Sequence, residues 1–248
     1  MDIMSLLIIF AVGMIAGSFG TLTGGGSLIT IPVLIFLGLP LHSAIGTNRL
    51  GVTGVHIAGW YKFNQKKMVN YAFGFMIGIP ALLGSMLGVN LVLQMNEMIL
   101  KRLVATLMIF ILVFITVKPK IGLEKAKSMV KNHVYIIGAV LSFFLGVYGG
   151  FYGAGTGTFL SYILILLFGQ TFLESAATRK IAGFFITTMA AILFGLAGVI
   201  DYSLGIALFI GTFTGSFIGA HYSDKIGDVW IKRLFFAIVL TMSITLMT

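Results

Sequence analysis

Long apolar runs separated by short polar stretches make up most of this sequence. Most of the runs are about 20 residues long, which is the length a helix needs to cross a hydrocarbon core of about 30 Å. The runs are continuous and do not alternate between apolar and polar residues, so they predict helices and not the strands of a membrane barrel. The sequence therefore predicts an all-α integral membrane protein. Its ten apolar segments lie at about 3–22, 27–38, 43–62, 70–93, 98–117, 134–152, 156–168, 174–198, 203–223 and 230–247.

Two of these segments are too short to span a bilayer comfortably. Segment 27–38 has 12 residues, whose helical rise is only about 18 Å, and segment 156–168 is similar. Glycine permits backbone that is neither helix nor strand, and in lipid such backbone persists only where protein covers it or water reaches it. Short, broken helices of this kind indicate a transport site. Each short segment follows a glycine cluster, formed by Gly24, Gly25 and Gly26 in the first case and by Gly153 and Gly155 in the second.

The two halves of the chain resemble each other. Residues 47–50 (TNRL) align with residues 178–181 (TRKI), 131 positions later, and the glycine clusters align with a shift of 129. The shift of 131 also relates 84–88 to 215–219 and 101–103 to 232–234. Four matches in the same order indicate a duplicated unit. The sequence thus predicts a first transmembrane repeat over 1–117, a basic cytoplasmic linker over 118–133 and a second transmembrane repeat over 134–248.

The basic residues of the loops predict an orientation. If all ten segments cross and the N-terminus is outside, eleven loop cations lie inside, against Lys101 and Arg102 outside. The alternative, eight spans with two re-entrant short segments, gives eight against five, so the positive-inside rule favours ten crossings. Five crossings per repeat is an odd number, which makes the repeats inverted, with both termini outside. The eleven cations are Lys62, Lys66, Lys67, Lys118, Lys120, Lys125, Lys127, Lys131, Lys225, Lys232 and Arg233.

Composition and charge exclude several functional classes. Only 9% of the residues are charged, against about 25% in soluble domains. The net charge of +9 lies in short loops, so no nucleic-acid partner is expected. The chain has no cysteine, and every Asp and Glu lies at a segment end or in a loop. With no carboxylate pair, no HExxH and no GxSxG, the sequence predicts neither an enzyme nor a metal or other cofactor.

Three cations lie inside predicted segments. Arg49 is about six residues into its segment, and Arg179 and Lys180 are equally deep in the matching one. Burying a cation at this depth costs free energy unless the cation pairs with an anion or a carbonyl, or lies in a water-filled cavity. The alternative is that these long side chains reach the headgroups. For Arg49 and Lys180 the sequence does not separate the two interpretations, and for Arg179 it favours the second. His56 is also deep, and a packed imidazole is expected in preference to a proton carrier.

An anion site between the two short helices follows as a hypothesis. Ser27 and Thr156 are placed as N-terminal caps, and a helix N-terminus carries free amides and about half a positive charge. Two such ends meeting near mid-membrane would bind a small anion, with neighbouring polar side chains as hydrogen-bond donors. The predicted substrate-binding residues are Gly24, Gly25, Gly26, Ser27, Thr47, Asn48, Arg49, Gly153, Gly155, Thr156, Thr178 and Lys180.

The first glycine motif resembles that of a known transporter family. Leu28, Pro32 and Gly38 follow the glycine cluster, and the stretch 44–47 (AIGT) lies downstream, with a weaker copy at 153–155 and 176–178. This pattern resembles the sulfite exporter TauE/SafE family. The resemblance implies an inner-membrane transporter of small anions, sulfur-containing ones such as sulfite or an organosulfonate. A passive anion channel is the alternative, and neither the direction of transport nor the oligomeric state follows.

Overall fold

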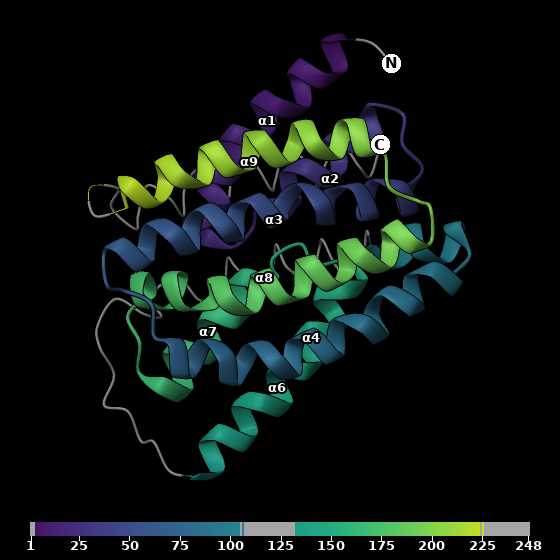
Figure 1. Cartoon of the computed structure of the whole chain (residues 1–248). Helices are drawn as coiled ribbons and strands as arrows, with labels where there is room; N and C mark the ends of the chain where they lie inside the picture. Colours follow the sequence, from purple (N-terminus) through teal and green to yellow (C-terminus); the bar gives the residue numbers. More distant parts are fainter. Residues whose placement is uncertain (1–2, 105, 107–131, 224, 226–248) are drawn as a thin grey trace.

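A computed structural model describes residues 3–104, 106, 132–223 and 225 (Figure 1). Within these ranges the regular structure is entirely helical, as predicted. A further helix begins at residue 97. Most of the predicted segment 98–117, nearly all of the linker 118–133 and the segment 230–247 lie outside the described residues. The helices are α1 (Ile3–Thr23), α2 (Ser27–Phe36), α3 (Leu41–Gln65), α4 (Tyr71–Gln94), α6 (Asn132–Phe151), α7 (Thr156–Phe168), α8 (Phe172–Leu196) and α9 (Tyr202–His221).

Five helices in the described part of the chain are long and apolar enough to cross a membrane. They are α1, α4, α6, α8 and α9. The short helices α2 and α7, of 10 and 13 residues, follow the glycine clusters as predicted. Helix α3 has 25 residues but carries several polar side chains, and it packs against both α8 and α9 inside the bundle. Thr47, Asn48, Arg49 and Thr53 on this helix are buried inside the protein.

The breaks before the two short helices are built on glycine. Gly24, Gly153 and Gly155 have φ values of +85°, +73° and +78°, in the left-handed region that a side chain disfavours. The prediction that Ser27 and Thr156 cap the short helices is wrong. Gly26 and Gly155 occupy the N-cap positions, and neither helix has a side-chain cap. Each hydroxyl residue is instead the first residue of its helix.

Glycines allow the closest helix contacts in the bundle. Helix α1 packs along α9, and α4 packs along α6. A Cβ at Gly84 or Gly88 would meet the carbonyls of Phe143 and Val147 on α6. On the other pair, a Cβ at Gly215 would meet the carbonyl of Met14. These spacings therefore mark helix packing, which in lipid depends on close backbone approach.

The same hydrogen bond occurs once in each half of the chain. The backbone N–H of Asp201 donates to Thr47 Oγ1 at 2.9 Å, and that of Asn70 donates to Thr178 Oγ1 at 3.2 Å. Both donors and both acceptors are 131 positions apart, and Asn70 and Asp201 are the N-cap residues of α4 and α9. Each half thus anchors the start of a helix belonging to the other half.

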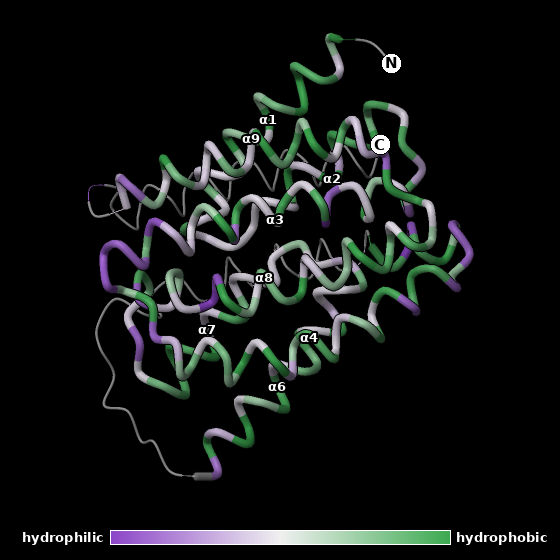
Figure 2. Tube along the Cα trace, in the orientation of Figure 1, coloured by the Kyte–Doolittle hydropathy of each residue, from purple (hydrophilic) through white to green (hydrophobic). Residues whose placement is uncertain are grey.

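The loops gather at two ends of the bundle. At one end, which we call the amino-terminal end, Ser5 lines a surface pocket together with 37–40 and 198–201. At the opposite, basic end, 67–70 and 169–170 line another pocket, and Lys66 donates to Ser223 Oγ at 2.9 Å. Helices α3 and α8 run in opposite directions between these ends (Figure 1). Hydrophilic residues concentrate in the loops of both ends, and the helices between them are largely hydrophobic (Figure 2).

Candidate anion site

The two glycine breaks touch each other inside the bundle. A Cβ built on Gly157 would lie 2.7 Å from the Cα of Gly24, and a Cβ on Gly24 would overlap the backbone of Gly157 and Thr158. Thr158 Oγ1 also donates to the carbonyl of Thr23 at 2.7 Å. The break in the first half is therefore in direct backbone contact with the start of α7, as the hypothesis of two meeting helix ends requires.

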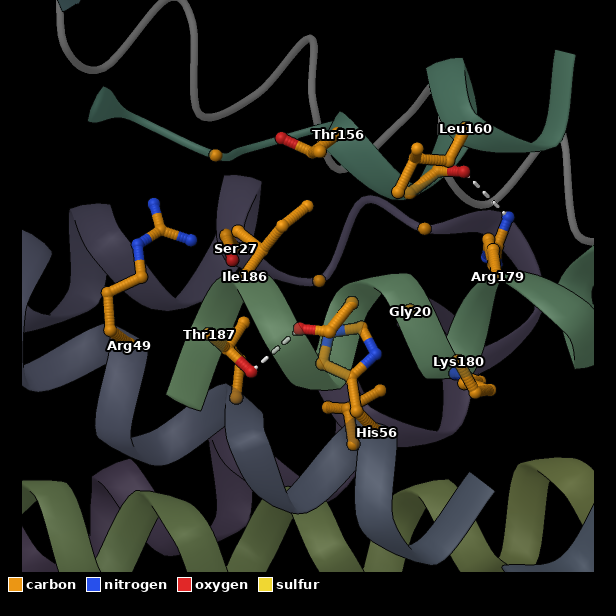
Figure 3. A pocket seen from close by; sticks show the side chains of 17 residues that line it. Gly20, Ser27, Arg49, His56, Thr156, Leu160, Arg179, Lys180, Ile186 and Thr187 are labelled. Carbon is orange, nitrogen blue, oxygen red and sulfur yellow. Dashed lines mark hydrogen bonds between the residues drawn. The ribbon is translucent and has the colours of Figure 1, made fainter. Parts of the chain in front are cut away.

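A cavity of about 50 Å³ lies at this contact, between the breaks and helices α3 and α8 (Figure 3). A single water needs about 10–15 Å³, so the space is large enough for a small polyatomic ligand. Figure 3 shows Arg49 at one side, Arg179 and Lys180 at the other, and His56 between them. The lining residues are Gly20, Gly24, Gly26, Ser27, Arg49, Val52, Val55, His56, Gly153, Thr156, Gly157, Leu160, Arg179, Lys180, Gly183, Ile186 and Thr187.

All three cations of the sequence analysis line this cavity. Arg49, Arg179 and Lys180 are 2%, 1% and 1% exposed, so the protein itself encloses them and they do not reach lipid headgroups. None of the described residues that line the cavity is acidic. Buried cations without a carboxylate are strongly unfavourable unless an anion, carbonyls or water solvate them. The cavity is therefore an electropositive space, enclosed by protein, that suits a negative ligand.

Arg49 is only partly satisfied by the protein. Its Nη2 donates to the backbone carbonyl of Tyr152, and its Nε is buried with no partner among the described residues. The guanidinium lies so close to Gly153 that a Cβ there would overlap it. Gly153 is thus required for Arg49 to lie where it does, and the guanidinium retains donor capacity for a ligand.

Lys180 enters the cavity from the other half of the chain. Its Nζ donates to Thr21 Oγ1 at 3.0 Å, and a Cβ on Gly59 would lie 2.7 Å from its Cε. An ammonium group has three donors, and this is its one hydrogen bond within the described part of the chain. Gly59 lies ten residues beyond Arg49 on α3, a helical rise of about 15 Å. The two cations therefore mark opposite sides of the cavity.

Arg179 differs from Arg49 and Lys180, because both of its terminal nitrogens donate hydrogen bonds to protein oxygens. Nη2 donates to the carbonyls of Thr21 and Leu22 at 3.0 and 2.8 Å. Nη1 donates to the carbonyl of Gly157 at 3.1 Å and to Ser161 Oγ. These partners belong to the end of α1 and the start of α7. Arg179 thus joins the two breaks, and its charge is largely compensated by carbonyl dipoles.

We expect Arg179→Gln to destabilise the protein, because it leaves buried carbonyls without donors. Each unsatisfied buried acceptor costs about 1–3 kcal/mol, so the unfolding temperature in detergent should fall by several degrees. Arg102→Gln is the matched control, since Arg102 is exposed at the amino-terminal end. Equal unfolding temperatures for the two variants would show that Arg179 does not join the breaks.

Two further polar atoms at the cavity have no hydrogen-bond partner in the part of the chain that the structure describes. Thr156 Oγ1 and His56 Nδ1 are buried and make no hydrogen bond within the described residues. The imidazole of His56 packs so closely on Gly183 that a Cβ there would overlap the ring. Buried polar atoms in proteins are almost always satisfied by protein, water or ligand. These two atoms therefore add hydrogen-bonding capacity to the space between the cations.

The predicted site residues fall into two groups. Asn48 lies behind the cavity, where its Nδ2 donates to Ser27 Oγ at 3.0 Å and its Oδ1 accepts from Thr30. The hydroxyls of Thr47 and Thr178 are used at the starts of α9 and α4. Gly24, Gly26, Ser27, Arg49, Gly153, Thr156 and Lys180 line the cavity. Gly25, Thr47, Asn48, Gly155 and Thr178 do not line it.

Sequence reasoning did not select several lining residues. Gly157 follows the second glycine cluster closely, and Gly183 lies one helical turn after Arg179 and Lys180, so spacing alone could have indicated both. The apolar residues of the cavity wall cannot be recognised from the sequence, because they are of the same types as other residues of membrane helices. The unselected lining residues are Gly20, Val52, Val55, Gly157, Leu160, Gly183, Ile186 and Thr187.

The chain is similar to known proteins along nearly its whole length. Residues 9–246 match the family model described as sulfite exporter TauE/SafE. A "Probable membrane transporter protein" of Haemophilus influenzae is 34% identical over 229 residues, covering 92% of this chain and 89% of the relative. "Probable membrane transporter protein YfcA" of Escherichia coli K12 is 26% identical, covering 97% and 88%. "Probable membrane transporter protein YdhB" of Bacillus subtilis is 25% identical, covering 93% and 94%. No solved structure matches the chain significantly.

Proposed function

Because this chain belongs to the sulfite exporter TauE/SafE family and is a multi-pass membrane transporter, we propose that its substrate is a small anion bound in the central cavity. The substrate class that we propose is sulfur-containing anions such as sulfite or an organosulfonate. One observation carries the proposal: three buried cations line a cavity to which the described residues contribute no carboxylate. Substrate is bound and released without chemical change.

The proposed binding mode uses both halves of the chain. Arg49 and Lys180 supply charge from opposite sides, and Ser27 and Thr156 supply hydroxyls from the first residues of α2 and α7. The N-termini of α2 and α7 add partial positive charge at the same place. Sulfite oxygens accept several charge-assisted hydrogen bonds at once. A ligand held this way links the two halves, which is how substrate binding would drive their relative movement.

The proposed architecture is a pair of inverted repeats of five helical segments each. Corresponding helices such as α3 and α8 run in opposite directions, and the bonds of Thr47 and Thr178 are duplicated across the halves. Ser5 and the loop 37–40 lie at the same end. The ten-crossing arrangement requires this, whereas re-entrant short segments would put them on opposite sides. The proposed location is the inner membrane, with the basic end cytoplasmic and the amino-terminal end outside.

The proposal predicts a large stabilisation of purified protein by its substrate. We expect one of sulfite, sulfate, thiosulfate, sulfoacetate and taurine to raise the unfolding temperature in a thermal-shift screen. A ligand at 100 times its dissociation constant adds about 2.7 kcal/mol, which is about 5–10 °C for a protein of this size. If none of the five stabilises the protein or is carried into liposomes, the proposed substrate class is wrong.

A passive anion channel would use the same charges. The two functions are separated by measuring uptake of the stabilising anion into liposomes with and without an imposed proton or sodium gradient. A secondary transporter accumulates the anion above its equilibrium level when the correct gradient is present. A channel only dissipates the anion's own gradient, whatever other gradient is imposed.

A further inference from the structure

A second, larger cavity lies beside the anion cavity, toward the amino-terminal end. Its volume is about 440 Å³. Helix α2, the loop after it and the helix that begins at residue 97 form most of its described wall. We call this cavity the vestibule, and define it by Ile31, Ile35, Leu39, Lys101 and Tyr152.

Only a thin partition separates the vestibule from the anion cavity. On α2, Ser27 lines the anion cavity and Ile31 lines the vestibule, a helical rise of about 6 Å. At the end of α6, Tyr152 lines the vestibule and the next residue, Gly153, lines the anion cavity. Two independent chain segments thus pass directly from one cavity to the other, and Ile31 and Tyr152 form the partition between them.

Tyr152 has an unusual hydrogen-bonding state for a buried residue. Its side chain is 0% exposed, and its hydroxyl has no partner in the ranges that the structure describes. Its ring packs edge-to-face on Tyr148, with centroids 6.5 Å apart. The hydroxyl of Tyr148, by contrast, donates to the carbonyl of Ala154 at 2.6 Å. A buried hydroxyl without a partner is unfavourable, so the Tyr152 hydroxyl would gain a hydrogen bond from an anion that displaces the partition.

The main chain of Tyr152 is tied to the anion site. Its carbonyl accepts the hydrogen bond from Arg49 Nη2. A movement that shifts the main chain at Tyr152 would therefore also free one Arg49 donor for the ligand. The position that matches Tyr152 in the first half, at the shift of 129, is Thr23, whose side chain is much smaller. Tyr152 therefore has no aromatic counterpart at the matching position of the first half.

We propose that the vestibule is the route by which the anion passes between the amino-terminal end and the central cavity, and that Tyr152 is its gate. The ring closes the partition, and the hydroxyl donates a hydrogen bond to the anion as it passes. If the gate opens by a shift of the main chain at Tyr152, it also releases one Arg49 donor, which couples access to binding. This inference rests on the proposed function, since it concerns the same transported anion. Lys101 and Glu97 line the vestibule and form an exposed ion pair at 3.2 Å, so their charges offset each other.

The first test compares Tyr152→Phe with Tyr148→Phe. Tyr152→Phe removes a hydroxyl that has no hydrogen-bond partner among the described residues, so we expect an unchanged or higher unfolding temperature. The initial rate of sulfite uptake into liposomes should fall about tenfold, the effect of one lost hydrogen bond to a charged group, with the equilibrium affinity retained. Tyr148→Phe removes a structural bond and should lower the unfolding temperature. Uptake by Tyr152→Phe at the wild-type rate would overturn the proposed passage of the anion past the Tyr152 hydroxyl.

The second test uses the absence of cysteine from the chain. Ile35→Cys places a single thiol in the vestibule, and Ser43→Cys places one in the neighbouring surface pocket at the same end. Both should react with a negatively charged methanethiosulfonate reagent. Only labelled Ile35→Cys should lose transport. A vestibule thiol that does not react, or that reacts without effect on transport, overturns the route. If wild-type protein carries no anion at all, the proposed function fails instead.

Discussion

Arg49→Gln is expected to weaken anion binding strongly and to leave the empty protein at least as stable as the wild type. Arg49 is buried, its Nε has no partner in the described chain, and no carboxylate lines its cavity. Removing an uncompensated buried charge relieves a desolvation penalty when no ligand is present. With the anion bound, the same change removes a desolvated charge pair worth about 2–5 kcal/mol. The dissociation constant should therefore rise by about 30-fold or more.

The measurement is a titration of the anion into purified variant and wild-type protein, together with their unfolding temperatures. Arg102→Gln is the control, because it removes one arginine charge from an exposed position. Loss of binding together with lower stability of the empty protein would show that Arg49 is structural. Wild-type affinity in the Arg49 variant would place the anion elsewhere.

The second large effect is expected from Gly24→Ala. A Cβ there would overlap the backbone of Gly157 and Thr158, and Gly24 also has a φ of +85°. The left-handed conformation costs about 1–2 kcal/mol, and forcing the two breaks apart adds about 1–3 kcal/mol. For a protein of this size the unfolding temperature should fall by about 5–15 °C. Anion binding should be lost as well, since the two breaks form the wall of the cavity.

Gly38→Ala separates the two contributions. Gly38 has a φ of +96°, yet a Cβ there would have no atom within 4 Å. Its substitution therefore reports the backbone conformation alone, and the difference between the two variants reports the contact of the breaks. If Gly24→Ala lowers the unfolding temperature no more than Gly38→Ala, the breaks do not depend on each other for their position.

The helices, the breaks and the buried cations could be read from the sequence because each has a local signal. Apolar runs of helix length predict α1 and α4, and the glycine clusters predict where α1 and α6 end. Arg49 and Lys180 were candidates because a cation deep in an apolar segment needs an explanation. These signals do not depend on knowing which segments are neighbours.

The remaining parts of the site depend on tertiary contacts that the sequence does not display. Thr47 and Thr178 looked like ligand groups, but each hydroxyl serves the start of a helix from the other half. Ser27 looked like a helix cap, but Gly26 holds that position and Asn48 donates to the serine hydroxyl. A polar residue beside a break can satisfy either a ligand or a neighbouring helix, and only the packing decides between them.

Two adjacent positions of the duplicated motif, residues 48–49 and 179–180, have different roles. Asn48 and Arg179 are equivalent, and each bonds a hydroxyl 18 residues earlier, on Thr30 and Ser161 of the short helices. Arg49 and its equivalent Lys180 both line the cavity. The first position of each pair hydrogen-bonds to the short helix, and the second places a positive charge at the cavity. This division explains why the two most similar-looking arginines, Arg49 and Arg179, are expected to behave differently on substitution.

The central claim is that the transported anion occupies the cavity between Arg49 and Lys180. Selenite has the shape and charge of sulfite, and its selenium scatters anomalously, so the most direct measurement is an anomalous difference map from crystals grown with selenite that the protein is shown to transport. We predict one selenium peak inside the cavity, within hydrogen-bonding reach of Arg49 and the hydroxyls of Ser27 and Thr156. An empty cavity, or selenium bound only outside it, would contradict the account.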